Sequence, residues 1–251
     1  MKELDALRAE LDCWGAAGRE ATLWWRDDDA ETADGPVQRM LDLSAKTEAP
    51  VFIAVVPGRA VDPLGPAMNA CATAVPIQHG WMHQDHSPAD VKGKWELGLH
   101  RPLAEITNEL ACGFRRMGDL FGPRFLPMIG PPWNRIAPEV TAALPAIGLR
   151  WLSTFAPRET AHPASGLTQI NGHCDIISWR RDRSFIGAEK TGNRLAEHLA
   201  ARRTGAVQDE PTGLLTHVWI NDEPAWTALE AVLDLVRHHP SARWLGAADF
   251  A

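Results

Sequence analysis

The feature that most constrains the fold of this chain is the regular alternation of short apolar runs with amphipathic segments. Pro50–Val56 is an unbroken apolar run rich in valine and isoleucine, which is typical of a strand buried on both faces of a parallel sheet. Pro102–Leu120 instead places apolar residues on one helical face. Repeated over 251 residues, this alternation predicts a single parallel α/β domain, either a barrel or a doubly wound sheet.

The other expected elements follow the same two periodicities. Residues 1–20 have the pattern of an amphipathic surface helix. Further strands are expected at Ala21–Arg26, Ala74–Gln78, Phe125–Ile129, Trp151–Phe155, Cys174–Ser178, Leu214–Trp219 and Arg243–Leu245, and further helices at Gly35–Lys46 and Ala225–His238. No internal repeat or evident linker divides the chain, so we expect one domain over residues 1–251.

Composition excludes several classes of function. Lys plus Arg is 25 against 32 for Asp plus Glu, giving a net charge of −7, and neither nucleic acid nor an anionic membrane is an expected partner. Charges interrupt residues 1–20, and no stretch approaches the ~18 apolar residues of a membrane span, so we expect a cytoplasmic protein. The four cysteines form no CxxC pair and are expected to be free thiols.

Two polar clusters follow expected strands. Asp27, Asp28 and Asp29 adjoin the first strand, and three adjacent carboxylates repel one another unless a cation compensates them. The alternative is a solvated helix N-terminus. His79 and His83 are four residues apart, so one helical turn would place both imidazoles on one face, a common arrangement for a divalent metal. Taken alone, such a spacing is more often structural or accidental.

Other candidates lie farther along the chain. His86 continues the histidine cluster as a third ligand or a residue that supports the ligands. His217 lies in an apolar run, where a histidine is usually a core residue, but it suits a general acid near neutral pH. Trp133 and Asn134 follow two prolines and are read either as a tight turn or as the rigid wall of a ligand pocket, which Trp219 would extend.

The order of these segments resembles the polysaccharide deacetylase superfamily, over about residues 21–220. The family's Thr-Phe-Asp-Asp-Gly motif is similar to residues 25–29, and its His-Ser/Thr-x-x-His motif to residues 79–83. Its Arg-x-Pro-Tyr/Trp motif is similar to residues 130–133, and its Leu-x-His motif to residues 215–217. The resemblance implies a distorted parallel (β/α) barrel of about seven strands.

The resemblance also implies an enzyme, a metal-dependent amide hydrolase. Asp27 would be the general base, His217 the general acid, and Asp28, His79 and His83 the ligands of one divalent metal. Zinc is the expected ion, with cobalt, nickel or iron as alternatives. The expected substrate is the acyl group, N-acetyl in the simplest case, of an intracellular sugar or small amide. The alternatives are a catalytically impaired barrel that binds metal or carbohydrate, and a metal-free enzyme that opens cyclic amides.

The sequence departs from the family pattern at three motifs. Gly130 replaces the arginine that holds the base, so Arg26, Arg135 or Arg180 would have to serve. Asp175 is the remnant of the motif that orients the acid. Asp29 replaces the first motif's glycine, so the base and ligand roles could shift by one residue to Asp28 and Asp29. Residues 84–100, which include Lys92, Lys94, Glu96 and His100, are expected to form either a loop over the site or a solvated connection.

Overall fold

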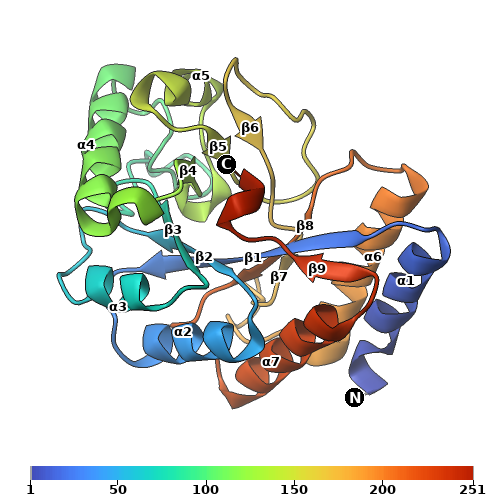
Figure 1. Cartoon of the computed structure of the whole chain (residues 1–251). Coiled ribbons are helices and arrows are strands. Elements are labelled where there is room, and N and C mark those ends of the chain that lie inside the picture. The colour runs from blue at the N-terminus through green and yellow to red at the C-terminus, as the bar shows by residue number, and fades with distance from the viewer. Residues whose placement is uncertain (1, 251) are drawn as a thin grey trace.

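A curled parallel sheet forms the centre of the computed structural model, which describes residues 2–250 (Figure 1). Its strands are β1 (Ala21–Ala30), β2 (Val51–Val55), β3 (Ala74–Gln78), β4 (Met128–Ile129), β5 (Trp151–Leu152), β6 (Thr168–Gln169), β7 (Cys174–Asp175), β8 (Thr212–Thr216) and β9 (Ala242–Trp244). They lie in the order β6-β5-β4-β3-β2-β1-β8-β7, and β9 pairs with the first residues of β1. The predicted parallel barrel class is confirmed, with nine strands in residues 2–250 rather than about seven.

One extended segment, residues 168–176, joins the two ends of this strand order. Its first part bonds to the β5 side, where the Gly172 amide donates to the Thr154 carbonyl at 2.9 Å. Its second part bonds to β8, beginning with the His173 amide, which donates to the Gly213 carbonyl at 2.8 Å. The sheet therefore closes on itself through a segment that changes partners along its length.

Helices cover the outside of the sheet (Figure 1). They are α1 (Asp5–Ala16), α2 (Gly35–Thr47), α3 (Leu64–Ala70), α4 (Leu103–Phe121), α5 (Pro138–Ile147), α6 (Ala188–Thr204) and α7 (Glu223–His238), with short 3₁₀ turns at Lys2–Leu4, Gly122–Arg124, Pro132–Asn134 and Ala247–Phe250. They pack in pairs, α1 on α6, α2 on α7 and α4 on α5. None of the helices in the described part of the chain is long and apolar enough to cross a membrane.

Side chains of β1 alternate between two cores, and this alternation places the catalytic candidates. Leu23 and Trp25 belong to the large cluster between the sheet and the helices. Trp24 belongs to a smaller cluster inside the barrel, where its ring lies edge-on to Phe52 with centroids 5.4 Å apart. Because strand residues point alternately to opposite faces, Arg26 follows Trp24 into the barrel interior.

Several element boundaries differ from the sequence-based expectation. β1 does not end at Arg26 but continues through all three aspartates to Ala30. β8 ends at Thr216, so His217 lies just beyond the strand rather than inside it. The 17-residue helix α6 was not predicted, because its sequence is mostly polar and lacks a wide apolar stripe.

A buried polar network fills the amino-terminal end of β7 and β8. The Gly213 amide donates to Nδ1 of His173, whose Nε2 lies 3.1 Å from the Glu210 carboxylate. His198 of α6 stacks on His173, with ring centroids 3.4 Å apart, and its Nδ1 lies 2.9 Å from the Thr212 hydroxyl. Burial and the nearby positive charge lower the pKa of His198 to about 3, so the native protein holds this imidazole neutral.

This depressed pKa predicts a pH-dependent stability. Since an unfolded histidine titrates near 6.5, the unfolded chain takes up a proton below that pH that native His198 does not. Stability contributed by this residue is therefore present above pH 6.5 and falls as the pH drops. At pH 5 the loss is at most about 2 kcal/mol, from ~1.4 kcal/mol per pH unit. Urea unfolding at pH 7.5 and 5 should show a smaller fall for His198→Gln than for the parent, whereas the exposed-site control His162→Gln should follow the parent.

Candidate metal and catalytic site

A carboxylate and two imidazoles converge at the carboxyl ends of β1 and β3. Oδ1 of Asp29 lies 3.1 Å from Nε2 of His79 and 3.1 Å from Nε2 of His83. Asp29 Oδ1 and His79 Nε2 are buried and have no hydrogen-bond partner in the described structure. Buried acceptor atoms facing one another without donors indicate a place for a cation, and two imidazoles with one carboxylate are a donor set that suits zinc.

A β-bulge brings Asp29, rather than the expected Asp28, to the histidines. The register between β1 and β2 shifts between Asp27 and Ala30, and Asp29 has a φ of 74°. Aspartate is one of the few residues other than glycine that enter this left-handed region readily. The bulge re-aims the side chain of Asp29. The carboxylate that faces the two histidines is thus that of Asp29, one residue beyond the expected ligand Asp28, at the position where the family motif has its glycine.

The two histidines are brought together by bends and not by the expected helical turn. Residues 79–83 contain no helix, and both Gly80 and His83 have left-handed backbones, with φ of 58° and 52°. Nδ1 of His79 lies 2.7 Å from the Gly130 carbonyl oxygen, to which it donates. In the neutral imidazole, a proton on Nδ1 leaves Nε2 with a lone pair that faces Asp29 and can bind a metal.

Asp28 is instead paired with Arg26 inside the barrel. The guanidinium Nη2 donates to Oδ2 at 3.0 Å, its Nε lies 2.9 Å from Oδ1 as an ion pair, and the Arg26 side chain is completely buried. Its Nη1 donates to the Ser153 hydroxyl at 2.7 Å. A Cβ on Gly130 would lie 3.5 Å from Nη1, so Arg26 occupies the space beside the position where the family motif has its own arginine.

Asp27 lies away from the metal-ligand candidates, on the helix side of β1. It accepts hydrogen bonds from the Thr216 hydroxyl at 2.5 Å and the Val218 amide at 3.1 Å. Complete burial raises its pKa to about 7, although these two donors oppose the shift. Because its donors flank His217 on both sides, Asp27 fixes the segment that carries that histidine.

His217 lies between two carboxylates. Its Nε2 is 3.4 Å from Asp175 Oδ2, and its Nδ1 is 3.7 Å from Asp29 Oδ2. Burial opposes the charged imidazole, but the two carboxylates outweigh burial and raise the pKa of His217 to about 10. Asp175 is itself held by the Trp179 indole, which donates to Oδ2 at 2.6 Å, so it can orient the imidazole.

Three of the predicted pocket residues surround this cluster. Trp133 lies 4.4 Å from the His83 ring, and the Trp219 indole donates to the Asp29 carbonyl at 3.0 Å. Asn134 accepts a 2.5 Å hydrogen bond from Arg26, so it supports the arginine that holds Asp28.

The other supporting residues that the sequence suggested lie elsewhere. His86 is on the following loop, where its amide bonds to the Trp95 carbonyl, and it is not part of the cluster of Asp29, His79 and His83. Arg135 donates to the Lys94 carbonyl, and Arg180 is exposed. Of the three candidate arginines, Arg26 is the one that reaches a site carboxylate. Ser153, which holds Arg26, had no signal in the sequence.

The network of His173, His198 and Glu210 also groups potential ligands, but its protonation differs. Nδ1 of His173 accepts a hydrogen bond from a backbone amide, so the ring proton must sit on Nε2. That nitrogen then donates toward Glu210 and has no lone pair for a metal. The opposite tautomer at His79 distinguishes the two clusters.

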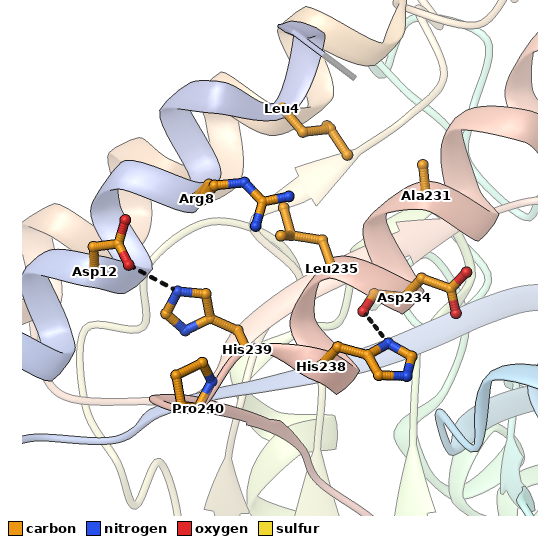
Figure 2. Close-up of a pocket in the computed structure, with 9 residues that line it drawn as sticks. All are labelled: Leu4, Arg8, Asp12, Ala231, Asp234, Leu235, His238, His239 and Pro240. Carbon is orange, nitrogen blue, oxygen red and sulfur yellow. Dashed lines mark hydrogen bonds and ion pairs between the residues drawn. The ribbon is translucent and has the colours of Figure 1, made fainter.

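A surface depression of about 480 Å³ lies between α1 and α7 (Figure 2). It is lined by Leu4, Arg8, Asp12, Ala231, Asp234, Leu235, His238, His239 and Pro240. His239 points across it to Asp12, with Nε2 and Oδ1 3.2 Å apart (Figure 2). This depression lies beside the chain that leads into β9, whereas the candidate site lies at the carboxyl ends of β1 and β3.

Comparison with known proteins finds the likeness in structure and not in sequence. No family model matches the chain, and no characterised protein matches it by sequence. A peptidoglycan deacetylase from Bacillus subtilis aligns with a TM-score of 0.55 at 13% identity, covering 92% of this chain and 90% of the other. A family 4 acetyl xylan esterase from Clostridium thermocellum, in complex with a cobalt ion, gives 0.55 at 13% identity, covering 91% and 89%.

A family 4 carbohydrate esterase from Streptomyces lividans, in complex with acetate, aligns with a TM-score of 0.52 at 13% identity over 88% of this chain and 87% of the other. These alignments extend over nearly the whole of each chain. They confirm the expected resemblance to the polysaccharide deacetylases at the level of the fold.

The buried pair of Arg26 and Asp28 predicts a strong stability effect. Arg26→Met should lower the free energy of unfolding by about 3–5 kcal/mol, because it leaves the Asp28 carboxylate buried without its counter-charge. The double variant Arg26→Met/Asp28→Asn should recover part of this loss, and urea unfolding of the four proteins in the cycle measures it. Lys46→Met, which removes an exposed ion pair with Glu230, is the control and should change stability little. If Arg26→Met and Lys46→Met lowered the stability equally, the strong stabilising role of the buried Arg26–Asp28 pair would be contradicted.

Proposed function

We propose that this protein is a metal-dependent hydrolase that removes an acyl group, N-acetyl in the simplest case, from an intracellular sugar or small amide. The observation that carries the proposal is the convergence of Asp29, His79 and His83, with the His79 tautomer set by the Gly130 carbonyl. The likeness in fold to deacetylases and esterases adds support, including one that was solved with cobalt.

Asp29, His79 and His83 would hold one divalent ion, for which zinc is the first candidate and cobalt, nickel or iron are alternatives. When bound, such an ion polarises the acyl carbonyl and lowers the pKa of a coordinated water. Three protein ligands leave coordination positions for water and substrate, which is the pattern of a catalytic site rather than a closed structural site.

Asp28 is the proposed general base, in place of Asp27. It lies next in sequence to the ligand Asp29, is nearly buried, and is oriented by the two-point contact with Arg26. Asp27 faces the helices, and its Oδ2 already accepts hydrogen bonds from the Thr216 hydroxyl and the Val218 amide. In the proposed reaction the water oxygen bonds to the acyl carbon and Asp28 takes the water proton.

His217 is the proposed general acid. With Asp175 orienting its ring and a pKa raised to about 10, it carries a proton at neutral pH. As the carbon–nitrogen bond breaks, His217 gives this proton to the leaving nitrogen, so the products are a carboxylic acid and an amine. His217 therefore starts in the protonation state that a general acid needs.

Exposed indoles beside His217 favour a substrate with a flat apolar face. Trp179 lies edge-on to the His217 ring, with centroids 4.7 Å apart, and is 41% exposed. Trp219 is 42% exposed and is fixed by its bond to the Asp29 carbonyl. Because both indole N–H groups are engaged, the rings are held in place before a ligand arrives, and a sugar ring or other planar group can stack on them.

The competing interpretation, an impaired barrel that only binds its ligand, was motivated by the missing arginine at Gly130. Arg26 fills the space beside that glycine and holds Asp28, so the missing motif arginine no longer argues for an impaired site. An enzyme that opens cyclic amides without metal would have no use for the convergence of Asp29, His79 and His83.

Substitution of the neighbouring aspartates separates ligand from base. Protein purified without chelator or affinity tag should contain about one metal ion per chain, and Asp29→Asn should lose most of it. Asp28→Asn should keep the metal but hydrolyse N-acetyl sugars and small amides about 10²–10⁴-fold more slowly. Mass spectrometry of bound metal and release of acetate measure the two effects. Retention of metal by Asp29→Asn together with its loss from Asp28→Asn would restore the original motif alignment.

The acid side of the site gives a second prediction. His217→Gln should reduce turnover by about 10²–10⁴-fold while leaving the metal content near that of the parent, since it removes the proton donor and not a ligand. The loss should be smaller for substrates with good leaving groups, such as an activated aryl acetate, whose departure needs no proton. Equal losses on both substrates would argue against the acid role.

A further inference from the structure

The turn that carries His83 has an unusual local structure. It runs from His79 to Gln84 with two left-handed residues and no helical hydrogen bonds of its own. A non-glycine residue such as His83 in that conformation costs of order 1–3 kcal/mol and persists only where the surroundings impose it. Something outside the turn must therefore hold His83 in place.

The carboxylate of Glu96 supplies that support. Its Oε1 accepts hydrogen bonds from the Met82 amide at 2.7 Å and, at a longer 3.4 Å, from the Gln84 amide, and its Oε2 accepts from the Trp81 amide at 3.2 Å. The residue is completely buried. Three backbone amides of the turn thus share one acceptor group.

Glu96 fits into space that Gly80 leaves free. A Cβ built on Gly80 would fall on Oε2 of Glu96 and would also press on Pro132, at 2.8 Å from its ring. The family motif has serine or threonine at this position, between the two histidines. In this chain the absent side chain leaves the room that the glutamate occupies.

The loop of residues 85–97 delivers Glu96 to this position. It is closed by the His86 amide, which donates to the Trp95 carbonyl at 2.9 Å. Leu97 then forms a bridge to Ile136 and accepts a bond from the Ala137 amide at 2.9 Å. The segment expected to be a loop over the site is thus anchored on both sides of Glu96.

The carboxylate of Glu96 is also a reason to connect this residue with the neighbouring cation site. In residues 2–250, no lysine, arginine or histidine forms an ion pair with this buried carboxylate, so backbone amides alone hold it. A fully buried, unpaired carboxylate is costly unless positive charge lies close by. The cation site formed in part by His83 lies on the turn that Glu96 binds.

We propose that Glu96 is a positioning residue that sets the backbone of the 80–84 turn and thereby aims His83 at the metal. This rests on the proposed function, since it assigns Glu96 a task for the same cation site. Glu96 does not bind the metal or touch the reacting atoms. It acts through backbone amides, and its charge adds to the negative potential that favours a cation.

The test is Glu96→Gln, which keeps the size of the side chain but turns one acceptor into a donor that opposes a backbone N–H. We expect the affinity of the apo-protein for Co²⁺ to fall about 10–100-fold, as is usual for partners that support metal ligands. The visible spectrum of bound Co²⁺ should change, because His83 is no longer aimed. Without metal, amide exchange at Trp81 and Met82 should accelerate about tenfold or more.

Asp85→Asn is the matched control. Asp85 is also a loop carboxylate that accepts from backbone amides, those of Ser87 and Trp95, but it does not touch the turn. It should leave Co²⁺ affinity and spectrum at parent values. Glu96→Asp, which keeps the charge on a shorter side chain, should lie between Glu96→Gln and the parent, and it takes the place of Glu96→Gln if that variant fails to fold.

The outcomes separate this inference from the proposed function. If the parent binds Co²⁺ and Glu96→Gln binds it with the same affinity and spectrum, the role of Glu96 is overturned while the metal site stands. If Asp85→Asn weakens binding as much as Glu96→Gln, the effect belongs to the loop in general and the inference also fails. If the parent takes up no Co²⁺ or Zn²⁺, both the proposed function and this inference fall.

Discussion

The two-point contact between Arg26 and Asp28 is the interaction on which the rest of the site depends. It puts two opposite charges inside a barrel that is otherwise lined by aromatic and aliphatic residues, and Ser153 and Asn134 bind the remaining guanidinium donors. A buried pair of charges needs such further partners, and those of Arg26 link β1 to the loops after β4 and β5. With Asp28 paired to Arg26, Asp29 is the carboxylate that faces His79 and His83.

β1 distributes four consecutive polar residues among four different tasks. Arg26 and Asp28 face the interior, Asp27 faces the helices and fixes the segment that carries His217, and the bulge turns Asp29 to the histidines. Alternation of side chains explains the first three, and the left-handed backbone at Asp29 explains the fourth. The three adjacent carboxylates seen in the sequence are thereby divided among an ion pair (Asp28), a buried carboxyl with a raised pKa (Asp27) and a proposed metal ligand (Asp29).

Strand and helix periodicity was enough to predict the fold class and most strands, because a strand buried on both faces leaves a clear apolar run. The convergence of the segments after β1, β3 and β8 was also predictable, since carboxyl ends of parallel strands share one edge. Whether Asp28 or Asp29 would face the histidines could not be decided from the sequence, because the bulge that turns Asp29 depends on the pairing of β1 with β2. The two histidines at 79 and 83 have the spacing of a helical turn, but Gly80 and His83 have left-handed backbones and the turn amides bond to Glu96 and not to one another, which the spacing does not reveal. Ser153 bears no sequence signal, since its role exists only once Arg26 crosses the barrel.

The segment of residues 168–176, which pairs first with β5 and then with β8, has a consequence for how the site is assembled during folding. Asp29, His79 and His83 come from β1 and the end of β3, which are joined through β2 within the first 83 residues. Asp175 and His217 come to lie beside Asp29 only when β8 has paired with β1, where Asp27 lies opposite Thr216, and this pairing of much longer sequence separation costs more chain entropy. The half of the site that attracts a cation is therefore encoded by more local contacts than the half that carries the proton donor. A nascent or partly opened chain can therefore bring the proposed metal ligands together before His217, the proposed acid, reaches them.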